Sequence, residues 1–155
     1  MIVYLKDFTL TGKFGPVEIG NLKIDIIRSL GQPDEDLKLL WGSEIVYGRY
    51  ELFFDDRDIL HGIQNDSYYQ SDPLTYEFKN SVFEIEPWFF RRDVWPTFRD
   101  IESILSRESF LFSRANYAGR AILKLSSGVY IDFEEEPENI FERPLVGLRY
   151  WPEKL

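Results

Sequence analysis

The sequence predicts an α+β protein in which two tandem repeats, each a helix followed by antiparallel strands, pack as one compact body with the helices on one sheet face. Three observations support this prediction. A short one-sided helix precedes a strand-rich segment in the first half of the chain, and the same order returns in the second half. Aromatic residues make up 17% of the 155 residues, and such large rings can fill a compact core at this length.

The first repeat, at about residues 15–66, opens with the helix. Ile26 and Leu30 lie four residues apart, so both side chains share one face of a helix. Asn21 is expected to cap the first turn with its side-chain oxygen. The segment 31–33 holds a glycine and a proline, which end a helix. A helix with one apolar face needs a surface to cover, and strands must provide it.

Strand-forming residues follow this helix. Residues 45–54 and 59–64 are rich in β-branched and aromatic residues, with Gly48 as a turn or bulge candidate. The polar turn 55–58 separates the two segments as in a hairpin. Ahead of the helix, residues 2–5 and 8–11 are predicted as short strands or an irregular lead-in, interrupted by glycines and a proline.

The second repeat, at about residues 93–151, begins with a second helix. Thr97 followed by Asp100 forms an acidic variant of the capping box, the side-chain pattern that starts a helix. Ile101 and Leu105 place two apolar side chains on one face of the helix.

Strands follow the second helix as they follow the first. We expect them at residues 121–125, 129–133 and 145–151. Gly62 in the first repeat and Gly147 in the second stand at the same place within matching strands. This agreement in the order of the elements and in the positions of the glycines predicts a duplicated unit inside a single domain of 155 residues.

Between the repeats, residues 74–79 and 82–86 alternate apolar and polar side chains, which predicts a connecting hairpin in the same sheet. The aromatic residues Trp88, Phe89 and Phe90 follow this hairpin. We expect these rings to fill the gap between the repeats as part of the core.

Composition excludes several classes of function. The chain has 27 acidic and 18 basic residues and a net charge of −9, so a nucleic-acid binder is disfavoured and a basic protein partner is favoured. It has no cysteine, which excludes disulfides and thiolate chemistry. No apolar run is long enough to span a membrane. The expected location is therefore the cytoplasm.

The segment GPVEIGNLKIDIIRSLGQPD and the strand YGRYELFF carry a resemblance to known families over residues 15–64. The first segment resembles small bacterial α+β domains with the fold of the β-lactamase-inhibitor protein. The strand is similar to those of bacterial immunity proteins, the partners of secreted toxins. The positions that match are Gly20, Ile24, Ile27, Leu30, Gly31, Pro33, Tyr47, Gly48, Tyr50, Glu51, Leu52 and Phe54. The resemblance implies a helix packed on a sheet, often duplicated, and a binding or inhibitory role. Envelope lipoproteins of this group carry a signal peptide and a lipidated cysteine, and neither is present here.

Candidate partner-binding residues come from two acidic segments and from a polar loop with adjacent tyrosines. They are Asp55, Asp56, Asp58, Tyr68, Tyr69, Glu134, Glu135 and Glu136. By the duplication, the acidic segments lie at equivalent ends of the two repeats and are expected to form one negative rim. Asp55, Asp56 and Asp58 lack the spacing of a calcium loop, so a turn is favoured over a metal site.

The sequence contains no phosphate-loop, dinucleotide-binding or serine-hydrolase motif. We therefore predict a non-enzymatic protein-binding module, an immunity-type inhibitor that docks a basic toxin or enzyme without a cofactor. The alternative is a small-ligand-binding protein or hydrolase with a site between the repeats, which would use Glu84, Glu86, His61 and Arg91. A homodimer scaffold is a third possibility, and an exposed apolar patch would be its sign.

Overall fold

The computed structural model describes residues 1–68, 71–90 and 94–152. It confirms the α+β class, with three α-helices and a large antiparallel sheet. The helices are α1 (Leu5–Thr11), α2 (Lys23–Leu30) and α3 (Phe98–Arg107), and short 3-10 turns lie at η1 (Pro73–Thr75) and η2 (Ile140–Glu142). The strands are β1 (Ile2–Tyr4), β2 (Glu35–Leu39), β3 (Gly42–Tyr47), β4 (Tyr50–Phe54), β5 (Leu60–Asn65), β6 (Glu84–Glu86), β7 (Phe112–Tyr117), β8 (Arg120–Leu125), β9 (Tyr130–Phe133) and β10 (Leu145–Tyr150).

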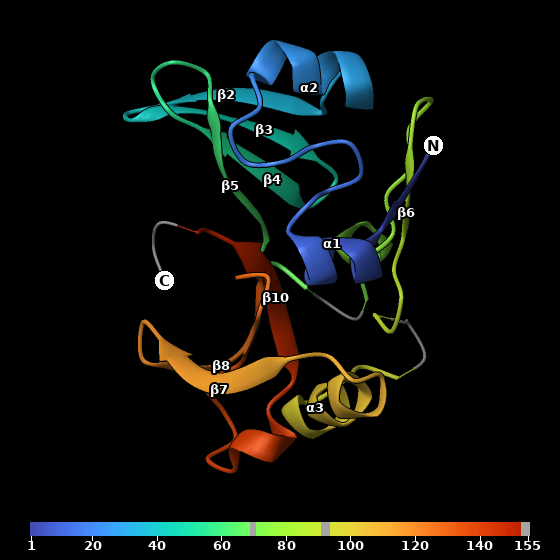
Figure 1. Ribbon diagram of the computed structural model, residues 1–155, viewed down its shortest axis with the longest axis vertical. Coiled ribbons are helices and arrows are strands. Elements are labelled where there is room, and N and C mark those ends of the chain that lie inside the picture. The colour runs from blue at the N-terminus through green and yellow to red at the C-terminus, as the bar shows by residue number, and fades with distance from the viewer. Residues whose placement is uncertain (69–70, 91–93, 153–155) are drawn as a thin grey trace.

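Two copies of one unit build the large sheet. Its strand order is β2-β3-β4-β5-β10-β9-β8-β7, so each half is a run of four consecutive antiparallel strands. Helix α2 precedes the first run and α3 precedes the second. Figure 1 shows α2 at one end of the molecule and α3 at the other, with β5 and β10 between them. The observed order is that of a helix-plus-sheet unit repeated in tandem.

The register of the strands relates the two units by an approximate two-fold axis at the centre of the sheet. Gln64 of β5 pairs with Arg149 of β10, and these two residues occupy equivalent positions in the two repeats. Going outward, Gln64 pairs with Glu51 and Arg149 pairs with Tyr130. The pairing register also shifts at equivalent places in the two repeats, between β5 and β4 in the first and between β10 and β9 in the second.

Gly62 and Gly147 lie beside the two register shifts, at positions where a side chain would clash with its neighbours. A Cβ atom at Gly62 would lie 2.3 Å from the ring of Trp151, and one at Gly147 would lie 2.2 Å from Oδ1 of Asp132. Each glycine thus leaves room for a large or charged side chain to lie flat on the sheet.

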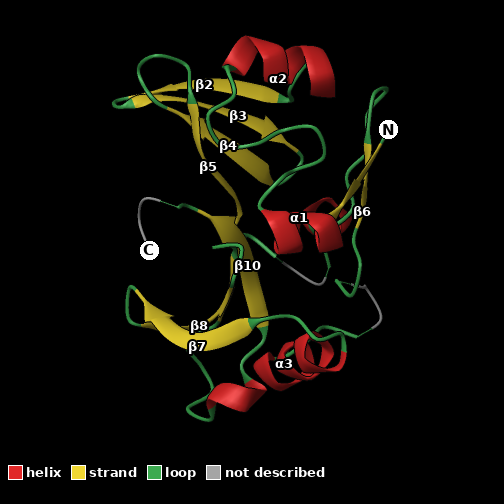
Figure 2. Ribbon diagram, in the orientation of Figure 1, coloured by secondary structure: helices red, strands yellow, loops and turns green. Residues whose placement is uncertain are grey.

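All three helices cover one face of this sheet. The core cluster includes Phe8 of α1, Ile26 of α2 and Ile101 of α3, together with Leu52 and Leu148 from the central strands. Figure 2 shows the helices (red) on the outside of the bend of the sheet. None of the helices in the described part of the chain is long and apolar enough to cross a membrane.

The capping predictions have opposite outcomes. At α3 the capping box is confirmed, because the Asp100 carboxylate accepts from the Thr97 backbone N–H at 2.9 Å and Thr97 Oγ1 accepts from the Asp100 N–H. At α2 the prediction for Asn21 is wrong. The N-cap residue is Leu22, whose side chain makes no capping hydrogen bond. Asn21 Oδ1 instead accepts from the Glu18 N–H at 2.9 Å.

Several strand predictions need correction. Residues 8–11 belong to helix α1, which buries Leu5, Phe8 and Thr9 along one side. The expected hairpin of 74–79 and 82–86 forms its antiparallel contact, since Lys79 bridges Glu84 and the Ile85 N–H donates to the Phe78 carbonyl at 2.8 Å. It is not part of the large sheet, however, because β6 pairs in parallel with β1 in a separate two-stranded sheet. Within 45–54, Gly48 lies in a turn that separates two strands, as expected for a turn candidate.

Candidate functional site: the helix-free face of the sheet

The face of the large sheet opposite the helices, here called the helix-free face, carries most of the polar chemistry of the sheet. Residues paired across antiparallel strands point to the same side, so the register identifies its members. One row crosses all eight strands. It consists of Glu35, Val46, Glu51, Gln64, Arg149, Tyr130, Lys124 and Ser113.

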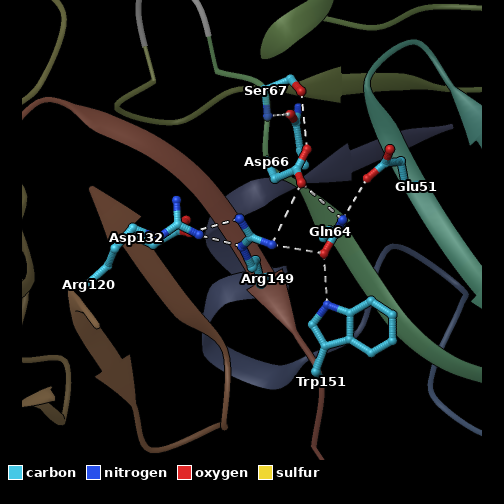
Figure 3. Close-up of polar contacts among 9 residues, drawn as sticks. Glu51, Gln64, Asp66, Ser67, Arg120, Asp132, Arg149 and Trp151 are labelled. Carbon is cyan, nitrogen blue, oxygen red and sulfur yellow. Dashed lines mark hydrogen bonds and ion pairs between the residues drawn. The ribbon is translucent and has the colours of Figure 1, made fainter. Parts of the chain in front are cut away.

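A buried ion pair anchors the middle of this face (Figure 3). Arg149 donates to Asp132 Oδ2 from Nε at 3.0 Å and from Nη2 at 2.9 Å. The Asp132 side chain is almost wholly buried, and only 12% of the Arg149 side chain is exposed. Arg120 Nη2 lies 3.4 Å from the same oxygen. Asp66 Oδ2 lies 3.7 Å from Arg149 Nη1, so the two guanidinium groups face two carboxylates in this part of the face.

Gln64 connects the two repeats across the central strands (Figure 3). Its Oε1 accepts from Arg149 Nη1 at 3.2 Å and from the Trp151 indole N–H at 2.9 Å. Its Nε2 donates to Glu51 at 2.8 Å and to Asp66 at 3.3 Å. The amide therefore holds an acidic cluster on one side and a guanidinium and an indole on the other.

Apolar side chains adjoin this network. Ile122, Tyr130 and Trp151 form a second buried cluster, separate from the main core, and partly buried Phe53 and Tyr117 pack against it. The Phe53 and Trp151 rings lie 4.8 Å apart. When one face of an antiparallel sheet is open to water, that face ordinarily carries polar residues. Ile122 and Tyr130 are wholly buried and Trp151 is 8% exposed, so the partly buried rings of Phe53 and Tyr117 are the aromatic part of this cluster that reaches the surface. Exposed aromatic rings beside charged groups are typical of binding surfaces.

Charge on the helix-free face is divided between the repeats. The first repeat contributes Glu35, Glu44 and Glu51, whereas the second contributes Arg120 and Lys124. The pKa of Glu51 is raised from 4.5 to about 7, mainly by burial. The hydrogen bond from Gln64 lowers this pKa, and the nearby charges of Asp66 and Glu44 contribute to the rise. Burial also raises the pKa of Glu44. Glu51 and Glu44 lack a cationic partner within the described residues that would lower these values.

The raised pKa of Glu51 predicts a pH dependence of stability. Between its ordinary value of 4.5 and about 7, the folded chain holds this proton more tightly than the unfolded chain does. Unfolding then releases a proton, so this contribution to stability is complete at low pH and is lost as pH rises through about 7. Melting temperatures measured from about pH 5 to pH 8 should show that Glu51→Gln flattens the decline. An equal decline in the variant would contradict the assignment to Glu51.

The first acidic segment forms a structured turn. Asp55 Oδ1 accepts from the backbone N–H groups of Arg57 at 2.9 Å and Ile59 at 3.0 Å, and these bonds lower its pKa. Asp56 and Asp58 are exposed. Asp55 therefore shapes the turn, and the other two carboxylates are available to a partner. Among the described residues, no group of three or more His, Cys, Asp or Glu is arranged to hold a metal ion.

The two acidic segments do not form one rim, which corrects the expectation. Glu134, Glu135 and Glu136 are exposed and follow β9, as the Asp55–Asp58 turn follows β4. Strands β4, β5, β10 and β9 are successively antiparallel, so the ends of β4 and β9 lie at opposite edges of the sheet. Because a two-fold axis relates the repeats, the turn after β4 and the equivalent loop after β9 point in opposite directions along the strands.

Tyr68 is also corrected as a surface candidate. It is only 2% exposed, and its ring stacks on Phe90 at 5.2 Å. Phe90 is fully buried, as expected for the aromatic connector, and Trp88 and Phe89 pack against the core. Tyr69 lies outside the described residues.

The residues of the alternative function do not converge. His61 lies on the large sheet with its ring 5.3 Å from that of Trp151, whereas Glu84 and Glu86 belong to the two-stranded sheet. Arg91 lies outside the described residues. At the junction of the repeats, Gln64 and Arg149 occupy the helix-free face where the alternative would need a pocket.

An exposed apolar tip joins β2 to β3 and was not among the sequence predictions. Leu40 is 84% exposed and Trp41 is 82% exposed. A groove next to this tip is shared with Asp55, Asp56 and Asp58. The signal was three large apolar residues in a row before Gly42, Leu39, Leu40 and Trp41, between the charged residues Lys38 and Glu44.

Comparison of the chain with protein-family models, with curated proteins and with solved structures finds no match.

Proposed function

We propose that this protein is a non-enzymatic protein-binding module of the immunity type, which inhibits a basic toxin or enzyme in the cytoplasm by docking it on the helix-free face. The observation that carries the proposal is the partly buried rings of Phe53 and Tyr117 on that face. Glu35 and Glu51 of the first repeat and the cationic Arg120 and Lys124 of the second lie on the same face. Protein interfaces combine such an aromatic centre with a charged surround.

The polar network makes this surface suited to binding. Arg149 and Gln64 are held by several hydrogen bonds each, so their side chains are already ordered before any partner arrives. Binding to an ordered surface costs less conformational entropy than binding to a mobile one. The partner would meet fixed donors and acceptors.

Charge explains why a basic partner is favoured. The chain carries a net charge of −9, and opposite net charge accelerates encounter. On the first repeat, Glu35 lies on the helix-free face. Exposed Asp56 and Asp58 lie in the turn between β4 and β5, where the Asp58 carbonyl accepts from the Lys23 backbone N–H. A lysine or arginine of the partner could reach Glu51, whose carboxylate has no cation of its own among the described residues.

The proposal is tested by capture from native lysate at low and high salt, with mass spectrometry of the retained proteins. The variant Glu35→Lys/Asp56→Lys/Asp58→Lys reverses charge on the first repeat. The matched control, Glu134→Lys/Glu135→Lys/Glu136→Lys, reverses three exposed carboxylates at the opposite edge. We expect one basic protein that is held at low salt and released at high salt, lost from the first variant and retained by the control. Equal retention by the wild type and the first variant would reject the proposed surface.

A further inference from the structure

Strand β2 is an unprotected edge of the large sheet. It occupies one end of the strand order and β7 occupies the other. All five residues of β2 are exposed. An edge strand offers backbone N–H and C=O groups that can pair with another strand.

The apolar side chains at this edge are unusually exposed. In addition to Leu40 and Trp41, Leu37 is 41% exposed and Leu39 is 38% exposed. The equivalent tip of the second repeat, between β7 and β8, contains only Ala118 and Gly119. The apolar tip is therefore a property of the first repeat and not of the repeated fold.

The sequence of β2 is complementary to itself. It reads Glu35-Asp36-Leu37-Lys38-Leu39. If a second copy pairs in antiparallel fashion with Leu37 opposite Leu37, each Asp36 faces a Lys38 of the other copy, twice by symmetry. Opposite charges placed directly across antiparallel strands stabilise the pair. Continued beyond the strand, the same register brings Trp41 opposite Pro33 of the other copy.

The groups required for these ion pairs are available. Lys38 makes no ion pair within the described part of the chain, and Asp36 uses only Oδ1, toward Lys23 of α2. The equivalent edge of the second repeat offers a contrast. The same arrangement about Ala115 in β7 would place Arg114 opposite Asn116, and Arg114 is already paired with Glu102 at 2.6 Å.

We propose that a second copy of this chain pairs with β2 to form a symmetric dimer whose sheet continues across both molecules. In this antiparallel pairing the corresponding faces of the two sheets lie on the same side, so the two-fold axis is perpendicular to the sheet. The two helix-free faces then lie on the same side of the dimer and remain uncovered. This dimer does not rest on the proposed function, because its ion pairs use Asp36 and Lys38, whose side chains alternate to the side of β2 opposite Glu35.

Sedimentation equilibrium of the full chain and of two charge-reversal variants tests the dimer. The wild type should approach twice the 18.4 kDa of one chain as concentration rises. Lys38→Glu and Asp36→Lys should each weaken self-association about tenfold or more, because each homodimer then opposes like charges twice. An equimolar mixture of the two variants should restore association, because every cross-strand pair is again opposite in charge.

Two further variants complete the test. Trp41→Ser should weaken the dimer, whereas Asn116→Glu, which changes the residue equivalent to Lys38 on β7, should leave it unchanged. A single 18.4 kDa species at every wild-type concentration overturns the proposal, as does a dimer that Lys38→Glu does not weaken. A chain that stays monomeric and loses its lysate partner on Lys38→Glu also overturns it, because β2 would then be the partner's site. Retention of the partner by dissociated Lys38→Glu separates the two proposals.

Discussion

Replacing Asp132 with alanine is expected to destabilise the protein by about 3 kcal/mol or more, which is the usual cost of removing one member of a buried ion pair. The substitution leaves Arg149, with only 12% of its side chain exposed, next to Arg120 without the carboxylate between them. Gln64 and Asp66 are the remaining acceptors of Arg149, and the closest Asp66 contact is 3.7 Å. Chemical denaturation measures the change in the free energy of unfolding.

Two variants sharpen the Asp132 test. Asp132→Asn keeps one acceptor for Arg149 and should cost clearly less than the alanine variant. Glu102→Ala removes the partner of Arg114, an exposed pair, and should have a much smaller effect. If Asp132→Ala and Glu102→Ala have similar effects, the ion pair under the helix-free face is not a structural anchor.

Replacing Gly42 with alanine is expected to have a comparably large effect, about 3 kcal/mol or more in the free energy of unfolding. A Cβ atom there would lie 1.9 Å from the backbone carbonyl oxygen of Phe54, and Gly42 has a φ of +127°. Backbone atoms cannot move aside as a flexible side chain can, so β3 would have to separate from β4 at this end.

A matched control isolates the backbone clash at Gly42. Gly119 lies in the corresponding hairpin tip of the second repeat, has a φ of +81° and has nothing within 4 Å of an added Cβ atom. Gly119→Ala therefore imposes conformational strain alone, about 1 kcal/mol. Thermal melts of the two variants should differ widely, and equal melting temperatures would show that the Gly42 contact relaxes at little cost.

Local signals in the sequence predicted the parts of the fold that local chemistry determines. Thr97 and Asp100 specify the start of α3 whatever surrounds it, and this prediction is confirmed. The predictions failed where tertiary contacts decide. Helix α1 has only seven residues, and its Phe8 packs on Phe14 and on Tyr150, which comes from the other end of the chain.

Edge strands were missed for a related reason. Strand β2 alternates polar and apolar residues only over residues 36–39, and all of its residues are exposed, so no run of buried apolar residues marks it as a strand. Strand β7 has no fully buried residue either. Only pairing with β3 and β8 makes these segments strands.

The candidate site was predicted least well, because its members are far apart in the chain. Arg149 meets Asp132 and Gln64 only through the register of β5, β9 and β10. The matching positions of Gly62 and Gly147 were the available signal, since they align the two central strands about Gln64 and Arg149. Acidic composition instead drew attention to the exposed turns.

The most direct test of the helix-free face is the affinity of the captured partner for Phe53→Ala/Tyr117→Ala, measured by calorimetry after a thermal melt shows that the variant is folded. These two partly buried rings lie on the helix-free face. The control is Ile24→Ala, which removes a side chain that is 54% exposed on α2, on the opposite side of the sheet. We predict that the double variant binds about 30-fold more weakly, as expected when a central aromatic pair is lost, and that the control binds like the wild type. Unchanged affinity of the double variant, with weakened binding by Ile24→Ala, would place the partner on the helix side and contradict the account.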